Sequence, residues 1–299
     1  MIEAPFTIDT SLADLSKDEW LLAIAEIAEE DGFYQTLGAK HHAIYVERKP
    51  TLLVSFESLS GMRSLSAMSH PLGWEMVRTY GWSHLCIASE GDTWFRDENV
   101  YAFFDRLIDD GFFDEFEKVI FYGAGPDSRI AEWDDRFKEM RRTDFGSRFG
   151  YAPDMLEAAE EAFILYDPNV ALDAMHASLF TRPNVTKLRM RHMGLALQSD
   201  LLQLDQFETV LSLAAEGKLT RLNFAKLYRS RREHRSYLKT LLVTLETDDR
   251  KRLILHLCRH VNARIQAPRF VRKQKLLEAE LMMQQVQDEP ENDDISKNG

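Results

Sequence analysis

Two polar residues that could cooperate in acid–base chemistry follow two late predicted strands. Asp167 comes directly after the strand "FILY", and His192 follows "TKLRMR". In open α/β sheets ligands bind at the carboxyl ends of the strands, so both residues are expected near that edge. A carboxylate can orient an imidazole, which then takes a proton from a nucleophile. Asp167 and His192 are therefore the candidate acid and base.

Both residues also fit purely structural roles. The sequence "YDP" is typical of a helix start, in which Asp167 would cap a helix that begins at Pro168. His192 could equally be a polar residue at the end of its strand. A catalytic pair requires hydrogen-bonding side chains, about 2.6–3.2 Å apart.

The nucleophile that such a pair needs is missing from its expected position. A strand-to-helix elbow that presents a serine reads G-x-S-x-G, because only small neighbours fit around the exposed hydroxyl. After the predicted strand "KVIFYG" the chain reads Gly123-Ala124-Gly125-Pro126-Asp127. Gly125 stands at the nucleophile position and has no side chain, and Ser128 comes three residues too late. The sequence thus predicts that this nucleophile is lacking.

Other polar residues give weaker signals. Further candidates at strand ends are Ser58, Ser60, Ser89 and Glu90. His41 and His42 are adjacent in a predicted strand, so they should point to opposite faces and not share a metal ion. His256 and His260 have the i, i+4 spacing of helical metal ligands, but the glutamate of H-E-x-x-H is absent. We predict no cofactor and no metal site.

Charge is distributed unevenly along the 299 residues. The net charge is −12, yet the stretch from Glu216 to Lys275 contains 17 Lys/Arg and 5 Asp/Glu, so the rest of the chain carries −24. The basic helices "KLYRSRREHR" and "RKQKLL" favour docking of a protein partner or of an acidic part of the same chain. Nucleic acid is not the expected partner, because no recognisable reading motif accompanies them.

Cysteine usage and the distribution of apolar residues indicate the cellular compartment in which the protein is expected. Cys86 and Cys258 are far apart in apolar stretches, which predicts free buried thiols and a reducing cytoplasm. No apolar run of about 18 residues is present, and the acidic N-terminus does not resemble a secretory signal.

The elements that must position these residues follow from periodicity. Ser16 and Glu19 have capping-box spacing before a helix at 17–30. Strands then alternate with helices from about 41 to 192, which predicts a doubly wound, mostly parallel sheet. In it "HHAIYVE" and "TLLVSFES" are expected to pair, "KVIFYGAG" to be buried and "DMLEAAEEA" to be helical. The predicted domains are a helical segment at 1–34, an α/β core at 35–198, a helical lobe at 199–285 and a disordered acidic tail at 286–299.

Several long stretches resemble a bacterial family of α/β-hydrolase-like proteins. They include "GWSHLCIASEGDTWFRD", "VIFYGAG", "EWDDRFKEMRRTDF", "GYAPDMLEAAEEAF" and "YDPNVALDAMHASLFTRPNVTKLRMRHMG". Genome annotation often labels members of that family phosphoadenosine phosphosulfate reductase. The resemblance spans most of residues 10 to 270 and implies an α/β-hydrolase-like core.

The sequence departs from this family at Gly125. In the family the strand continues into a glycine-rich elbow, a helix and a further strand, whereas this chain passes directly to "PDSRIAEWDD". A shortened α/β-hydrolase-like sheet is therefore expected. Three functions remain open: a non-catalytic, hydrolase-derived interaction or scaffold protein; a hydrolase or acyltransferase of unusual mechanism using Asp167 and His192; and a reductase. The third is contradicted by the absence of an SGGKDS-type loop and a late cysteine motif.

Overall fold

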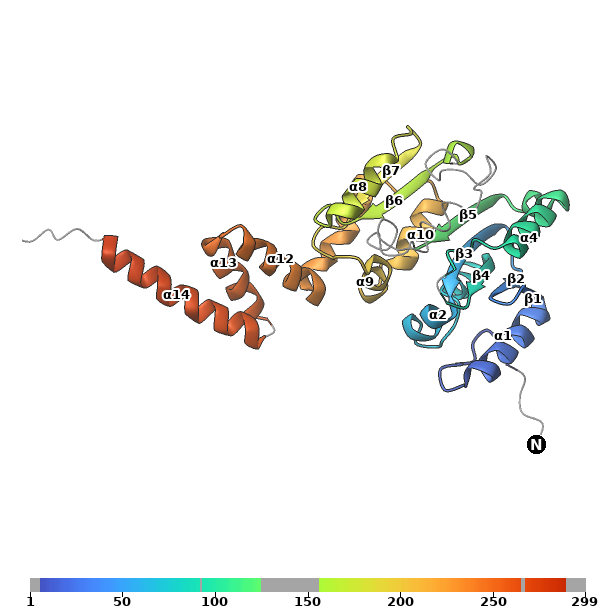
Figure 1. The fold of residues 1–299 in the computed structure, drawn as a ribbon, viewed down its shortest axis with the longest axis horizontal. Coiled ribbons are helices and arrows are strands. Elements are labelled where there is room, and N and C mark those ends of the chain that lie inside the picture. The colour runs from blue at the N-terminus through green and yellow to red at the C-terminus, as the bar shows by residue number, and fades with distance from the viewer. Residues whose placement is uncertain (1–5, 92, 125–155, 265–266, 289–299) are drawn as a thin grey trace, which may run out of the picture. The chain divides into compact units, whose positions relative to one another are not determined.

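The computed structural model describes residues 6–91, 93–124, 156–264 and 267–288. Within these ranges the protein is a mixed α/β structure with a mostly parallel central sheet and a helical C-terminal region (Figure 1). The chain divides into two compact units, one formed by Met1–Met190 and Leu195–Arg229, the other by Arg191–Gly194 and Ser230–Gly299. None of the described helices is long and apolar enough to cross a bilayer.

The first unit contains every described strand. The strands are β1 (Gly32–Leu37), β2 (His41–Val46), β3 (Thr51–Ser58), β4 (Ser83–Ser89), β5 (Lys118–Gly123), β6 (Ala162–Tyr166) and β7 (Val185–Arg189). Its α-helices are α1 (Lys17–Asp31), α2 (Leu59–Leu65), α3 (Trp74–Tyr80), α4 (Glu98–Asp109), α8 (Ala171–Leu179), α9 (Leu197–Gln203), α10 (Phe207–Ala215) and α11 (Arg221–Leu227). The second unit holds α12 (Arg235–Thr247), α13 (Lys251–Asn262) and α14 (Pro268–Asp288).

Five strands form the central sheet in the order β1-β2-β4-β3-β5. The β1–β2 and β2–β4 pairings are antiparallel, and the β3–β4 and β3–β5 pairings are parallel. The predicted pairing of "HHAIYVE" with "TLLVSFES" is wrong, because β4 lies between β2 and β3. No sequence pattern predicts β1, which forms a hairpin with β2 and pairs with the edge of β2 that faces away from β4.

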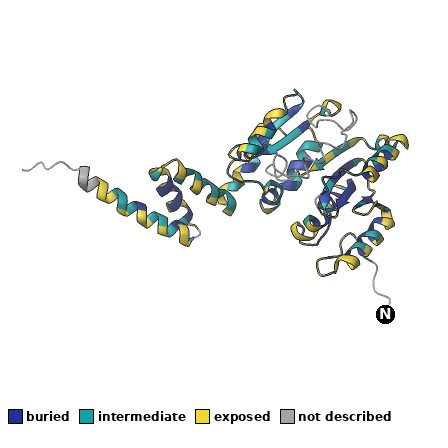
Figure 2. Cartoon of the chain, in the orientation of Figure 1, coloured by how far each residue is buried: buried dark blue, intermediate teal, exposed yellow. Residues whose placement is uncertain are grey.

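Helices cover both faces of this sheet, as predicted for a doubly wound fold. On one face α1, α2 and α3 pack with β2 and β4 around the buried Trp20, Met62 and Trp74. On the other face α4 contributes Val100, Phe103 and Leu107 to a second cluster. All seven residues of β4 are buried, since it lies in the middle of the sheet (Figure 2).

Local signals determined the ends of α1. Ser16 Oγ accepts a hydrogen bond from the Glu19 backbone N–H, and the Glu19 carboxylate accepts one from the Ser16 N–H at 2.9 Å. The predicted capping box is thus confirmed, and α1 ends at Asp31, with Gly32 as its C-cap.

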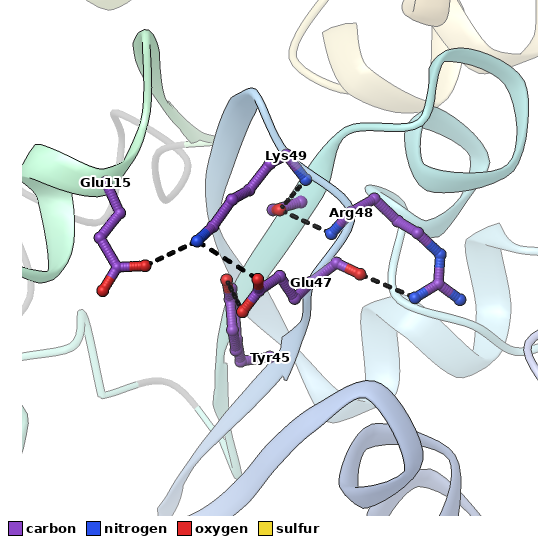
Figure 3. A network of polar contacts seen from close by, with 6 residues as sticks. Tyr45, Glu47, Arg48, Lys49 and Glu115 are labelled. Atoms are coloured by element: carbon purple, nitrogen blue, oxygen red, sulfur yellow. Dashed lines mark hydrogen bonds and ion pairs between the residues drawn. The ribbon is translucent and has the colours of Figure 1, made fainter.

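A polar network holds the link from β2 to β3 (Figure 3). Lys49 Nζ lies 2.8 Å from a carboxylate oxygen of Glu115 and 3.3 Å from one of Glu47. Ser83 Oγ accepts hydrogen bonds from the backbone N–H groups of Arg48 and Lys49, each at 2.8 Å. These contacts lie at the end of the sheet where β4 begins, opposite the carboxyl ends of the parallel strands. They hold in place the connection that crosses from β2 over β4 to β3.

Two expectations about the later elements are wrong. β5 was predicted to be buried, but its residues are half-buried or exposed, and Phe121 is 60% exposed. Only β3 pairs with β5 among the described strands, so β5 lies at the edge of the five-stranded sheet there. In "DMLEAAEEA" the described part forms a single 3₁₀ turn, Leu156–Ala158, rather than an α-helix.

The remaining strands form a separate parallel pair, β6–β7. The predicted C-terminal helices are confirmed, although those from α9 to α11 group with the first compact unit. In the second unit, α12, α13 and α14 share a core that includes Leu242, Cys258 and Phe270. Both cysteines are free and buried, as expected.

Candidate functional site

The carboxyl edge of the central sheet gathers the predicted polar residues of β2, β3 and β4. Because β2 runs antiparallel to β4, its first residue, His41, lies opposite Ser89, the last residue of β4. β3 ends on the same edge, with Ser58 paired to Ser89.

The serines and the glutamate of this edge have local structural partners. Ser58 Oγ caps α2 by accepting a hydrogen bond from the Gly61 N–H at 3.0 Å. Ser89 Oγ donates to the Gly91 carbonyl at 3.2 Å. The Glu90 carboxylate lies 2.5 Å from Lys17 Nζ. These contacts stabilise turns and helix starts. The histidines are therefore the better candidates for a functional site at this edge.

His41 forms a hydroxyl–imidazole–carboxylate arrangement with the loop that follows β4. Its Nε2 lies 2.7 Å from Thr93 Oγ1, and its Nδ1 lies 3.8 Å from Asp97 Oδ2. Thr93 Oγ1 also accepts a hydrogen bond from the Phe95 N–H at 3.2 Å. If the hydroxyl donates to Nε2, the ring proton sits on Nδ1, which faces Asp97 but lies too far from it for a hydrogen bond.

The protonation states of this arrangement suit proton transfer. Burial lowers the pKa of His41, so the ring is neutral near pH 7. Partial burial acts to raise the pKa of Asp97, but hydrogen bonds from Asn99 prevail and lower it, which keeps the carboxylate ionised.

The backbone next to Thr93 is strained. Trp94 and Phe95 both have positive φ, at 54° and 57°, a conformation that is costly for bulky residues.

His42 points to the other face of the sheet. Its Nδ1 lies 2.7 Å from the Tyr34 hydroxyl, and the two rings stack with centroids 5.6 Å apart. His41 instead contacts Phe95 on the opposite side of β2. The prediction that these adjacent histidines face opposite sides of the sheet is confirmed.

A second group of polar side chains lies inside the first unit, between β3 and the following helices. It consists of Ser55 and Glu57 on β3 and His84 and Cys86 on β4, all buried. The sequence analysis did not predict a site here, although a sequence pattern indicates one. In "SFE" and "HLC" two polar residues stand two positions apart within apolar strands, so each pair lies on one face of its strand.

Asp167 occupies a structural position after β6. Its carboxylate accepts a hydrogen bond from the Asn169 N–H at 2.9 Å, and its own N–H donates to the Asp173 carboxylate at 3.2 Å. The following helix begins at Ala171 rather than at Pro168, so Asp167 shapes the turn before α8. Asp167 is fully buried.

His192 belongs to the other compact unit and contacts α12. Its Nδ1 lies 3.4 Å from Thr244 Oγ1, and its ring meets Tyr237 edge-on, with centroids 5.9 Å apart. Gly125, at the predicted nucleophile position, lies outside the described residues.

The second unit carries a small basic pocket. It is lined by Arg232, Glu233, Leu238, His260, Val261 and Arg264. Glu233 forms an ion pair with Arg264, so two guanidinium groups and one imidazole surround a single carboxylate. An anionic group of a ligand would find cationic partners there.

No protein-family model, curated protein or solved structure matches the chain. The geometry described above is therefore the basis for the proposed function.

Proposed function

We propose that the protein is a hydrolase-derived interaction protein whose basic helical unit binds an acidic, amphipathic segment of a partner protein. The observation that carries the proposal is the combination of basic and exposed apolar side chains on this unit. Between Arg231 and Lys275 the sequence contains 13 Lys/Arg and 4 Asp/Glu, against a net charge of −12 for the whole chain.

Strand order supports the hydrolase origin. The order β1-β2-β4-β3-β5, in which β2 runs antiparallel to its neighbours and the other described neighbours are parallel, is compatible with the α/β-hydrolase-like core that the family resemblance implies. Where the resemblance implies a missing helix and strand, the described sheet stops at β5 and a separate pair, β6–β7, follows. The hydrogen bonds of Asp167 with Asn169 and Asp173 support a role for Asp167 in the turn before α8.

Exposed apolar residues on α14 favour a protein partner over nucleic acid. Leu276 is 55% exposed and Met283 is 60% exposed, and their spacing of seven residues puts them on one helical face. Several cations of this unit are already paired, as Arg259 is with Glu278 and Lys251 with Glu280. A polyphosphate would meet fewer free cations than the composition implies, whereas an acidic amphipathic peptide matches both the charge and the apolar surface.

Fluorescence anisotropy with the full chain tests this proposal. An acidic amphipathic peptide should bind more tightly than the same peptide with its glutamates changed to glutamine, and more tightly than a single-stranded oligonucleotide. Arg232→Glu, in the basic pocket, should weaken peptide binding several-fold. Arg221→Glu, an exposed arginine of the first unit, is the matched control and should change little. Equal binding of both peptides, or tighter binding of the oligonucleotide, would contradict the proposal.

A second candidate function is ester or acyl hydrolysis at the carboxyl edge, favoured by the contact of Thr93 with His41. In this reaction Thr93 Oγ1 attacks the acyl carbon as His41 Nε2 takes the hydroxyl proton, and the protonated ring then returns that proton to the leaving alcohol. Asp97 would stabilise the imidazolium. Water releases the acyl group in the second half of the reaction.

A panel of short acyl esters separates the two functions. The interaction proposal predicts no turnover by the wild-type protein. The second candidate predicts turnover that Thr93→Ala and His41→Ala abolish and that His192→Ala leaves intact. Turnover lost in His192→Ala alone would contradict both and return the acid–base role to His192.

A further inference from the structure

The buried polar group of β3 and β4 has the composition and spacing of a metal site. Ser55 and Glu57 are two residues apart on β3, and His84 and Cys86 are two apart on β4, so each pair lies on one face of the sheet. Ser55 lies opposite Cys86 in the parallel register. All four residues are at most 6% exposed.

The potential ligand atoms converge on one point. One oxygen of Glu57 lies 3.7 Å from Cys86 Sγ and 4.0 Å from His84 Nε2. One ligand atom from each of Glu57, His84 and Cys86 lies within 4.8 Å of the other two. Ser55 Oγ stands between them, 2.6 Å from Glu57 and 2.8 Å from His84 Nε2.

Hydrogen bonds alone do not satisfy all the buried polar atoms of these four side chains. Glu57 is buried, and its carboxylate accepts hydrogen bonds from two neutral donors, the Ser55 hydroxyl at 2.6 Å and the Leu72 N–H at 3.0 Å. His84 Nδ1 is buried without a hydrogen-bond partner. Buried polar groups of native proteins are usually paired. An ion bound at His84 Nε2 would leave Nδ1 unpaired, so the metal site is inferred from the convergence of Glu57, His84 and Cys86.

We propose that Glu57, His84 and Cys86 bind one divalent transition-metal ion, with Zn²⁺ as the best fit, inside the core of the first unit. One carboxylate and one thiolate carry two negative charges, which a divalent ion balances. Thiolate and imidazole ligands suit Zn²⁺ and disfavour Mg²⁺ and Ca²⁺, which prefer oxygen. Ser55 Oγ lies 2.6 Å from Glu57 and 2.8 Å from His84 Nε2, closer than two ligands of one zinc ion lie to each other, so it would have to move outward to become a fourth donor.

Distances are compatible with tetrahedral Zn²⁺. Zinc binds nitrogen and oxygen at about 2.0–2.2 Å and sulfur at about 2.3 Å, so neighbouring ligand atoms lie about 3.3–3.6 Å apart. The 3.7 Å and 4.0 Å separations from Glu57 therefore need only a small contraction. A site closed by protein donors serves structure, since no position remains for substrate.

Burial of the site determines how it must be loaded. Gly73 packs against His84 so closely that a Cβ would lie 2.3 Å from the ring. With Trp20, Met62 and Trp74 covering the same face, the ion has to bind as the unit folds.

The test is refolding of the reduced full chain from urea with ZnCl₂ or CoCl₂, followed by dialysis and metal analysis. The wild type should retain one ion per chain, and the cobalt form should show a thiolate-to-cobalt charge-transfer band in the near ultraviolet. Cys86→Ala should lose this band and bind zinc at least ~10-fold more weakly. Cys258→Ala, which removes the other buried thiol, should behave as the wild type.

The wild-type measurement keeps the proposal falsifiable if Cys86→Ala does not fold. Refolded wild type without bound metal would overturn it. Metal binding without the thiolate band would also overturn it and would point to the exposed His256 and His260 of α13 instead. Loss of the band in Cys258→Ala rather than in Cys86→Ala would exclude the proposed ligands.

Discussion

At the scale of single residues, a buried polar side chain of the first unit depends on a small neighbour that leaves it room. His84 is fully buried on β4, and its ring occupies the space beside Gly73. The backbone of Gly73 has φ of −67°, which any residue adopts, so glycine is needed there for space rather than for conformation. Substitution at Gly73 therefore tests packing alone.

Gly73→Ala should lower the free energy of unfolding by about 1–3 kcal/mol, because the new methyl group overlaps the His84 ring and overpacks the core. Urea denaturation of the wild type and the variant measures the difference. Gly123→Ala is the control, since a Cβ at Gly123 meets nothing within 4 Å. Equal unfolding midpoints for Gly73→Ala and the wild type would show that the imidazole has room to move.

At the scale of elements, the position of β5 is the main departure from the expected fold. Its sequence, "KVIFYG", has the apolar character of a strand covered on both sides. In the described structure it pairs only with β3, and Phe121 is 60% exposed. An exposed apolar edge strand is a template for pairing with other chains.

Phe121→Lys should therefore reduce concentration-dependent self-association of the protein, because a charge on the edge opposes strand pairing between molecules. Light scattering over a concentration series measures the effect. Leu22→Lys makes the same chemical change on α1, where Leu22 is 72% exposed, and should have little effect. An equal reduction by both variants would attribute the effect to net charge instead of to the edge of β5.

At the scale of the whole chain, four histidines with lowered pKa values lie in the first unit. They are His41, His42, His70 and His84, and burial is the main cause for each. Because these rings are neutral when folded and take up protons on unfolding below their ordinary pKa of 6.5, they stabilise the fold above that pH. Their contribution is lost as the pH falls toward their folded values. Glu57, with a raised pKa, has the opposite dependence.

We expect the urea midpoint of the metal-free full chain to fall between pH 7 and pH 5, with net uptake of protons on unfolding, since the four histidines outweigh the two glutamates with raised pKa values, Glu57 and Glu208. Denaturation at both pH values and in two buffers of different ionisation enthalpy measures midpoint and uptake. A midpoint that stays constant or rises on acidification would show that the histidines titrate normally in the folded protein.

Parts of the candidate site could be predicted and others could not. Opposite facing of His41 and His42 follows from the alternation of side chains along a strand, which is local. Thr93 and Asp97 could not be assigned to His41, because 52 residues separate His41 from Thr93 and only the β2–β4 pairing brings them together. The same holds for Glu57 and His84, which meet through the β3–β4 pairing.

The sequence by itself determined the types and approximate ends of most elements, such as the capped start of α1, because capping and hydrophobic period act within a few residues. It also determined the two buried free thiols. Only the tertiary structure decided that β4 separates β2 from β3, that β5 lies at the described sheet edge, and that His192 contacts α12. These facts depend on pairing between distant segments, for which local periodicity carries no information.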